Sequence, residues 1–353
     1  MTESYTRFGP ACKSLAGRRI GRRQFGKRLG GIRPIMRRVE LYFDPGFSLT
    51  EAVVSPVSPI VVLDSGLGGL TVVRALQAAL PHEDIVYFGD TARLPYGGKS
   101  AQTVTTFVRQ ILAYLRPVDP KHVVMACNTA TALSLATIRE EFADLSITGV
   151  IEPGARAAAE AAGKKEYPLI GIIATEGTIR SKAYEVAILK RRARARLLMR
   201  PTPLLVPIIE EGRGEDDPLV KLALKQYLMP LYQRGMDVLV LGCTHYPILK
   251  PLIQRMVGDK VAVVDSAQAC AEDVARRLGA VGLLRGDRDE SGSLRCFVTD
   301  NTPRFSALAQ RFLGMDVGEA TWVSIDELYE IDQLRIAGSI NETQVQETKR
   351  LTA

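Results

Sequence analysis

The sequence predicts an α/β fold built from two similar, doubly wound halves, each with a parallel sheet. Three observations support this prediction. From residue 60 onward, short apolar segments alternate with longer segments of helical periodicity, the apolar segments contain no polar alternation, and the same order of events occurs twice. A strand without polar alternation is buried on both faces, as in a parallel sheet covered by helices. Such strands alternating with helices are typical of doubly wound α/β folds.

Strands and helices are expected in strict alternation along the first half. Each four-residue apolar run is followed by a polar or glycine-containing turn and then by a helical pattern. The predicted strands are 60–63, 85–88 and 123–126, and the predicted helices are 70–80, 102–115 and 130–142.

The second half repeats this order. Strands are expected at 169–174 and 238–241, a helix at 181–193, and another helix after the second strand. The turn AspSerGly at 64–66 has a counterpart in ThrGluGly at 175–177. We infer two halves related by a pseudo-twofold axis. A further strand at 261–264 is expected to lead the chain back to the first half.

These patterns predict the domain boundaries. Residues 59–150 and 262–330 are expected to form the first domain and residues 151–261 the second, with the active site in the cleft between them. Residues 331–353 are expected to be a polar tail. Residues 1–38 contain eleven Lys and Arg but one acid, Glu3, so they carry +10 and leave −3 for the rest of a chain of formal charge +7. Residues 1–58 are therefore expected to be a disordered basic arm.

The arm is the sole support for a nucleic-acid or membrane partner. It resembles an Arg-rich targeting peptide, could bind anionic polymers, or is an unstructured extension, since Met36 could also begin the chain. No such partner is expected for the core. The sequence has no run of 18 apolar residues and no apolar stretch after the basic residues, so we expect a cytoplasmic protein.

The cysteines argue against a disulfide framework and a zinc site. The chain contains five, at positions 12, 127, 243, 270 and 296, with no CxxC pair, and only three histidines. An odd number of widely spaced cysteines is typical of free thiols in a reducing compartment. Neither a structural nor a catalytic metal is expected.

Two of the cysteines lie in similar turns. ValValMetAlaCysAsnThrAla at 123–130 and LeuValLeuGlyCysThrHisTyr at 239–246 each combine a strand, a cysteine, polar residues and a predicted helix. Two facing halves would place Cys127 and Cys243 on opposite walls of one cleft. Inverting a stereocentre by proton transfer requires a base on one face and an acid on the other. A helix N-terminus also favours a thiolate, although a single cysteine at such a place is more often a small buried hydrophobe.

Other polar residues are expected at the same edge of the sheets. In an open α/β sheet, ligands bind beyond the carboxyl ends of the strands. The residues at such ends are Asp64, Ser65, Asn128, Thr175, Thr244 and His245. The loop at 64–70 could hold an anion, but its glycines lack the GxGxxG spacing of a nucleotide site. Casting Asp90 as a ribose-binding acid would leave both cysteines unused.

Several segments together resemble the bacterial glutamate racemases. They are ValLeuAspSerGlyLeuGlyGlyLeuThrVal (62–72), TyrPheGlyAspThrAlaArgLeuProTyrGly (87–97), AlaCysAsnThrAlaThrAla (126–132), GlyValIleGluProGlyAlaArgAla (149–157), LeuLeuValProIleIleGlu (204–210) and LeuGlyCysThrHisTyrProIleLeu (241–249). The resemblance covers residues 59–315 in order, and the two cysteine segments are its most specific part. It implies a two-domain, pseudo-symmetric α/β enzyme without a cofactor that supplies D-glutamate for peptidoglycan synthesis.

The resemblance also implies residue roles. Cys127 and Cys243 would be the catalytic acid and base, assisted by Asp64 and His245. The residues implied to contact the substrate are Asp64, Ser65, Tyr96, Gly97, Asn128, Thr129, Thr244 and His245. Asp90, Thr175 and Glu210 would be supporting groups. Glutamate is the implied small-molecule partner, and a homodimer is compatible with the resemblance.

Three alternatives stay open at this point. A sister racemase for aspartate or hydantoins would use the same two-thiol chemistry, although ThrHisTyrPro after Cys243 favours glutamate. A binding protein that keeps the fold without activity would not need both thiols. A nucleic-acid-binding protein would depend on the basic arm alone.

Overall fold

The computed structural model describes residues 54–286, 290–300 and 303–337, with side chains from residue 307 onward in the last range. Residues 51–353 make up one compact unit. The predicted arm therefore lies outside the described residues except for 54–58, and the predicted tail lies outside them from residue 338.

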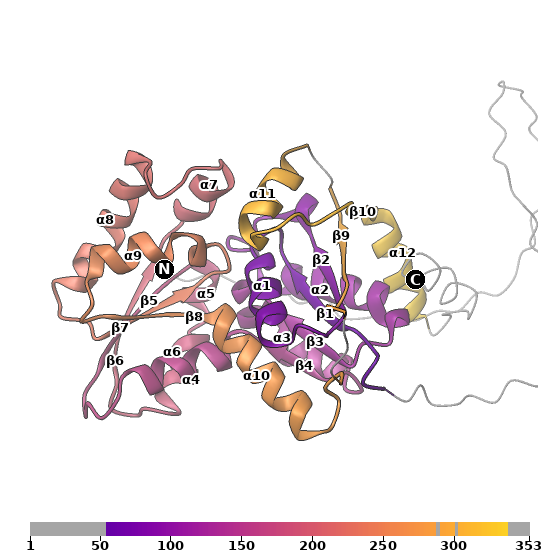
Figure 1. The fold of residues 1–353 in the computed structure, drawn as a ribbon, viewed down its shortest axis with the longest axis horizontal. Coiled ribbons are helices and arrows are strands. Elements are labelled where there is room, and N and C mark those ends of the chain that lie inside the picture. Colours follow the sequence, from indigo (N-terminus) through magenta and orange to yellow (C-terminus); the bar gives the residue numbers. More distant parts are fainter. Residues whose placement is uncertain (1–53, 287–289, 301–302, 338–353) are drawn as a thin grey trace, which may run out of the picture. The chain divides into compact units, whose positions relative to one another are not determined.

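The first sheet contains six strands, all parallel, in the order β10-β9-β2-β1-β3-β4 (Figure 1). The strands are β1 (Ile60–Asp64), β2 (Ile85–Gly89), β3 (His122–Met125), β4 (Ile147–Gly149), β9 (Leu294–Val298) and β10 (Thr321–Trp322). The strands β1, β2 and β3 are buried along their whole length. This burial explains why their sequences are apolar without interruption.

The second sheet contains four parallel strands in the order β6-β5-β7-β8. They are β5 (Leu169–Ala174), β6 (Arg196–Pro201), β7 (Val238–Gly242) and β8 (Ala262–Asp265). In Figure 1 these four strands lie together, apart from those of the first sheet. The predicted α/β class with two parallel sheets is confirmed.

Helices cover both faces of each sheet. In β1, Ile60 and Val62 belong to the same apolar cluster as α1 (Leu70–Ala79), whereas Val61 and Leu63 pack with α2 (Ala101–Leu115). The other helices are α3 (Asn128–Glu141), α4 (Ile151–Ala161), α5 (Glu176–Arg180), α6 (Ala183–Leu189), α7 (Leu205–Glu210), α8 (Pro218–Tyr232), α9 (Lys250–Val257), α10 (Ser266–Ala280), α11 (Pro303–Leu313) and α12 (Ile325–Ile336). No helix in the described ranges is both long and apolar enough for a membrane span.

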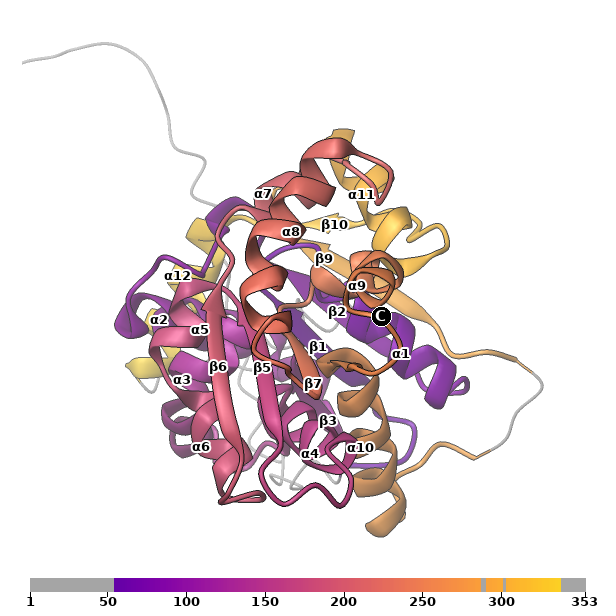
Figure 2. The same cartoon turned by 90° about the vertical axis from the view of Figure 1, so that its left-hand side faces the viewer.

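One predicted position is wrong near the return of the chain to the first sheet. The strand expected at 261–264 was assigned to the first half, but β8 pairs with β7 and extends the second sheet. The return is made by α10, which packs against both α1 and α4 (Figures 1 and 2). β8 is the next apolar segment after β7 in the chain, and it pairs with β7 at the edge of the second sheet. The overall division into domains stays a prediction.

Two helices also differ from expectation. The helix predicted over 181–193 is shorter than expected: α6 covers Ala183–Leu189, and α5 (Glu176–Arg180) is a separate helix before it, because Lys182 between them adopts a left-handed conformation with φ of 58°. The polar tail was predicted to begin at residue 331, yet α12 continues to Ile336. Its Ile331 packs against the apolar cluster of α2, and Asp332 is buried. The helical periodicity of apolar residues in α12 is weak, so the sequence did not predict this helix.

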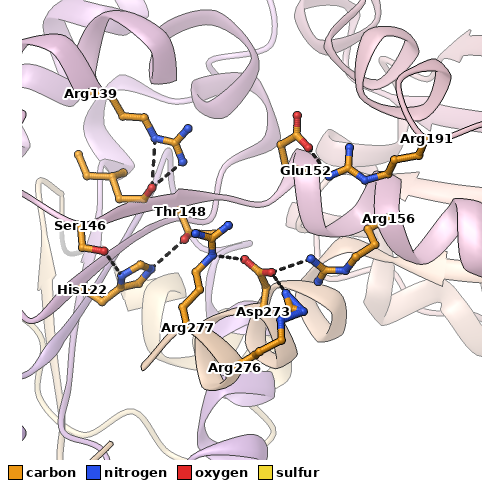
Figure 3. Close-up of polar contacts among 11 residues, drawn as sticks. His122, Arg139, Ser146, Thr148, Glu152, Arg156, Arg191, Asp273, Arg276 and Arg277 are labelled. Atoms are coloured by element: carbon orange, nitrogen blue, oxygen red, sulfur yellow. Dashed lines mark hydrogen bonds and ion pairs between the residues drawn. The ribbon is translucent and has the colours of Figure 1, made fainter. Parts of the chain in front are cut away.

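A buried carboxylate links the two helices that connect the sheets. Asp273 of α10 is 1% exposed and accepts hydrogen bonds from Arg156 of α4 at 2.7 Å and from Arg277 at 2.6 Å, with Arg276 as a third partner. Figure 3 shows these guanidinium groups converging on the one carboxylate. Burial acts to raise the pKa of Asp273, but the three arginines outweigh it and hold the pKa well below the usual range. The ion pair therefore joins α4 to α10 in its charged form.

We expect Asp273→Ala to lower the free energy of unfolding by about 3 kcal/mol, because three arginines lose one buried partner. The lowered pKa means that folded Asp273 stays charged where the unfolded residue takes up a proton. The stabilisation is therefore complete at neutral pH and declines as the pH falls below about 4. Urea unfolding at pH 7 and pH 3 measures both effects. Glu166→Ala removes the exposed Arg194 pair and should change stability by less than about 0.5 kcal/mol. Equal losses in the two variants would contradict this role of Asp273.

Candidate active site

The carboxyl ends of strands from both sheets meet at a small cavity of about 30 Å³. Nine of the sequence-predicted residues line it: Ser65, Tyr96, Gly97, Cys127, Asn128, Thr129, Thr175, Cys243 and Thr244. They follow β1, β2, β3, β5 and β7 in the chain. The structure thus brings the two cysteines, one from each sheet, to a single cavity. A separate cavity of about 440 Å³ lies among α1, α9 and α10 and is lined by none of these residues.

A larger pocket adjoins the small cavity. Its volume is about 290 Å³, and it shares Pro95, Gly97, Thr175 and Val206 with the cavity lining. Glu210 lines this second pocket. The small cavity therefore has a direct neighbour through which a molecule could approach the thiols.

Cys127 is the N-cap of α3. Its Sγ accepts a hydrogen bond from the N–H of Ala130 at 3.4 Å and lies 3.4 Å from the hydroxyl of Ser65. Burial, followed by the nearby Asp64 carboxylate, raises the pKa of the Cys127 thiol to about 12, although the Ser65 and Ala130 contacts lower it. The helix N-terminus does favour the thiolate here, as expected, because the Ala130 N–H lowers the pKa of the thiol, but desolvation outweighs this effect.

Cys243 has a different setting from Cys127. No helix begins at it: a 3-10 helix starts at Tyr246 and α9 follows at Lys250. The expected helix-start position of Cys243 is therefore wrong. Proline at position 247 removes a backbone donor and shapes this first turn. Instead, Sγ of Cys243 lies 3.8 Å from Nδ1 of His245.

His245 gives Cys243 a charged neighbour. Its Nε2 lies 2.9 Å from a carboxylate oxygen of Glu210 on α7. Burial acts to lower the pKa of His245, but hydrogen bonds with Cys243 and Glu210 outweigh it and raise the pKa to about 10. At neutral pH the imidazole is therefore a cation between a carboxylate and a sulfur. The two thiols differ in electrostatics, with a cation beside Cys243 and the Asp64 carboxylate near Cys127.

Asp64 lies behind the cavity and does not line it. The side chain is 1% exposed, and its carboxylate accepts from the N–H of Gly66 at 3.0 Å and from the hydroxyl of Thr244 at 3.4 Å. Burial raises the pKa of Asp64, while His245 and these hydrogen bonds oppose the rise. Asp64 thus joins the first-sheet loop to the Cys243 turn.

Glycine is required where this loop meets the Cys243 turn. A Cβ on Gly68 would lie 2.3 Å from Oγ1 of Thr244 and 2.5 Å from Nδ1 of His245. A methyl group at that distance must displace one of the two side chains. The glycine-rich loop therefore permits close contact between the halves.

Asp90, implied by the resemblance to be a supporting group, does not line the cavity itself. The side chain is fully buried and binds Arg93 at 2.8 Å and the hydroxyl of Thr299 at 2.9 Å, and Tyr96 donates to it. Asp90 therefore holds Tyr96, which lines the cavity, in place. The sequence carries no local signal that Tyr96 folds back onto a residue six positions earlier.

Threonine hydroxyls and a backbone bond connect the two sides of the cavity. Thr129 lies 2.8 Å from Thr175, which lies 3.0 Å from Thr178. The N–H of Gly177 donates to the carbonyl of Gly97 at 2.9 Å. These contacts link the loops after β2 and β3 to the start of α5.

Sequence reasoning missed several residues at this site. Tyr246 lies 2.6 Å from the hydroxyl of Thr202, and burial, then Cys243, raises its pKa well above the usual value. Tyr184 and Ser266 contact Asn128. A tyrosine that follows a strand is normally a core residue. The residue type alone therefore gave no sign that Tyr246 and Tyr184 lie at the site. In the described part of the chain, no three His, Cys, Asp or Glu side chains form a group that could hold a metal ion.

Comparison with known proteins gives consistent results. The profile of the family described as Asp/Glu/Hydantoin racemase matches residues 70–274. A glutamate racemase of Geobacter metallireducens is 44% identical over 271 residues, which are 77% of this chain and 98% of that protein. One from Neisseria meningitidis serogroup A is 45% identical over 267 residues, 76% of this chain and 97% of that protein.

Solved structures are similar as well. The glutamate racemase of Francisella tularensis, in complex with D-glutamate, has a TM-score of 0.70 and 34% identity, and the match covers 77% of this chain and 99% of that one. The glutamate racemase of Thermus thermophilus, in complex with β-chloro-D-alanine, has a TM-score of 0.67 and 41% identity, covering 77% and 99%.

Proposed function

Because this chain belongs to the Asp/Glu/Hydantoin racemase family, we propose that it interconverts L- and D-glutamate by proton transfer at the α-carbon. One observation carries the mechanism: Cys127 and Cys243 come from different sheets and line the same cavity. A planar carbanion between them would have one sulfur on each face. The similarity to glutamate racemases over more than three quarters of the chain supports glutamate as the substrate.

The reaction consists of two proton transfers. The thiolate of one cysteine takes the α-proton, and the electron pair of the broken C–H bond stays on the α-carbon as a carbanion. The thiol of the other cysteine then donates its proton to the opposite face, so the enzyme ends with the two protonation states exchanged. General acid–base transfers of this kind contribute about 10²–10⁴ in rate each.

The surroundings of the thiols support an assignment of roles. Cys127, whose pKa is raised to about 12, is a thiol at neutral pH and can act as the acid. Cys243 has the charged imidazole of His245 beside it, with Nδ1 3.8 Å from its sulfur. With Cys243 as the thiolate and Cys127 as the thiol, Cys243 would deprotonate L-glutamate. Cys127 would then protonate the opposite face of the α-carbon to give D-glutamate. The family resemblance implies the same assignment.

The carbanion needs polar stabilisation and exclusion of water, since no electron sink such as pyridoxal is proposed. Ser65, Asn128 and Thr129 line the cavity, and we propose that their hydroxyl and amide groups receive the α-carboxylate. The cavity of about 30 Å³ has room for about one water molecule. Glutamate entry therefore requires the walls to separate, and closure around the substrate would expel water.

The proposed setting is the cytoplasm, where D-glutamate would feed peptidoglycan precursor synthesis. We also propose a homodimer, for which the exposed apolar residues Trp322, Ile325 and Tyr329 of β10 and α12 offer a contact surface. Sedimentation velocity at micromolar concentration tests this assembly, and a monomer throughout would dismiss it.

Circular dichroism of L-glutamate tests the activity directly. We expect the signal to decay to zero with purified protein and no added cofactor, as equal amounts of the two enantiomers accumulate. L-aspartate and a hydantoin serve as the alternative substrates and should keep their signals over the same period. A stable signal from L-glutamate would refute the proposed activity, and faster decay of L-aspartate would favour the sister racemase.

A further inference from the structure

The amide of Asn128, which follows a strand of the first sheet, is held at both ends by residues that follow strands of the second sheet. Asn128 follows Cys127, lines the cavity and is 3% exposed. The hydroxyl of Tyr184 on α6 donates to Oδ1 of Asn128 at 2.8 Å, and Nδ2 of Asn128 donates to the hydroxyl of Ser266 at 3.4 Å. Since the amide is planar, anchoring its oxygen fixes the side on which its N–H groups lie.

The ring of Tyr184 is fitted tightly beside the second cysteine turn. Tyr184 is fully buried. A Cβ on Gly242, the residue before Cys243, would lie 3.1 Å from Cε2 of the ring, and a Cβ on Gly154 of α4 would lie 3.2 Å from its hydroxyl. The glycines therefore leave the space that the ring fills. One side chain thus contacts the neighbours of both cysteines, Asn128 and Gly242.

The tyrosine hydroxyl acts as a donor over the working pH range. Burial raises the pKa of Tyr184 above its ordinary value, and the nearby Ser266 hydroxyl reduces the rise. A protonated hydroxyl at 2.8 Å from Oδ1 gives the amide one orientation, with its oxygen toward Tyr184. A rotated amide would lose this donation to Oδ1 and would have to donate an N–H to the tyrosine oxygen instead, so the observed orientation is the one in which Tyr184 donates and Asn128 accepts.

We propose that Tyr184 is a positioning residue that orients the Asn128 amide so that its N–H, and not its oxygen, meets a carboxylate of the substrate. This inference rests on the proposed function, which places glutamate in the cavity. A carboxylate accepts hydrogen bonds only, so an amide presented by its N–H binds it and an amide presented by its oxygen repels it. Tyr184 does not touch the reacting atoms and acts through Asn128.

A double-mutant cycle on racemisation tests the proposal. Tyr184→Phe removes the hydroxyl and keeps the ring. We expect it to lower kcat/KM for L-glutamate about tenfold, mainly through a higher KM, because one hydrogen bond to a charged group is weakened. In the Asn128→Ala background, Tyr184→Phe should change kcat/KM by less than about twofold, since its target is gone. A purely structural role would lower kcat/KM by the same factor in both backgrounds.

Tyr114→Phe is the matched control. Tyr114 is a buried tyrosine of α2 that packs on Phe88 and Phe297, and it lines neither pocket at the site. This variant should keep KM within about twofold of the parent. Multiplicative effects of Tyr184→Phe and Asn128→Ala, or an unchanged KM in Tyr184→Phe, would overturn the proposal. Absence of racemisation in the unmodified protein would instead overturn the proposed function, so the two failures are distinguishable.

Discussion

Cys127→Ala and Cys243→Ala should each abolish racemisation, with kcat reduced by about 10⁴-fold. Each thiol is the sole acid–base group on its face of the α-carbon in the proposed mechanism, and removing either blocks a proton transfer in both directions. The two substitutions should therefore have similar effects although the thiols differ in surroundings. Circular dichroism with each enantiomer as the starting material provides the rates.

The other two buried cysteines supply the control. Cys270 lies on α10 and Cys296 on β9, and neither lines the cavity. Cys270→Ala and Cys296→Ala remove a sulfur of the same burial and should keep kcat within about twofold, with some loss of stability. A Cys243→Ala protein that racemised at a near-normal rate would reject the two-thiol mechanism, provided that its melting temperature showed it to be folded.

His245→Asn should lower kcat for L-glutamate by about 10²-fold. The substitution removes the charged imidazole whose Nδ1 lies 3.8 Å from Cys243, and with it the polar partner of that sulfur in the proposed proton transfer. The loss should be larger with L-glutamate than with D-glutamate as the starting material, because Cys243 is the base in the first case. His82→Asn, at a histidine that lines neither pocket at the site, should leave both rates unchanged.

The pH dependence of the racemisation rate tests the same role of His245. His245 has its pKa raised to about 10, so it stays charged through neutral pH and loses its proton as the pH rises toward 10. The rate from L-glutamate should therefore fall at that pH. Glu210→Gln removes a carboxylate that raises the pKa of His245, so the inflection should move to lower pH. Ionisation of the substrate is the same with both proteins and cannot cause this difference. An inflection that stays in place would show that His245 does not control the rate.

The strands and turns of the site were predictable from sequence because their signals are local. The runs that became β1, β2, β3, β5 and β7 are apolar throughout and are buried throughout. β6 was not predicted because it is an edge strand. It contains Arg196 and Arg200 among its apolar residues and is at most half-buried, so it lacks the continuous apolar run of the central strands. α4 was not predicted because Pro153 and Gly154 in its first turn are residues that usually indicate a turn or loop.

Electrostatic properties were less predictable, because they depend on residues far apart in the chain. The sequence showed that Cys127 precedes a helix, but the opposing effects of burial and Asp64 appear only after folding. The similar cysteine turns suggested equal helix starts, yet Cys243 has His245 and Glu210 in place of a helix. Tyr184 reaches Asn128 across 56 positions, and no local pattern reports such a contact.

Racemisation in D2O tests the central claim, that each thiol serves one face of the α-carbon, most directly. Starting from L-glutamate, mass spectrometry or NMR of the first few per cent of product reports the origin of the new α-hydrogen. The proposed mechanism predicts early D-glutamate that carries deuterium, while the remaining L-glutamate stays mostly protiated, because the proton removed and the proton delivered reside on different sulfurs. A single shared base would return the substrate's own hydrogen, and early D-glutamate that retained it extensively would contradict the two-thiol account.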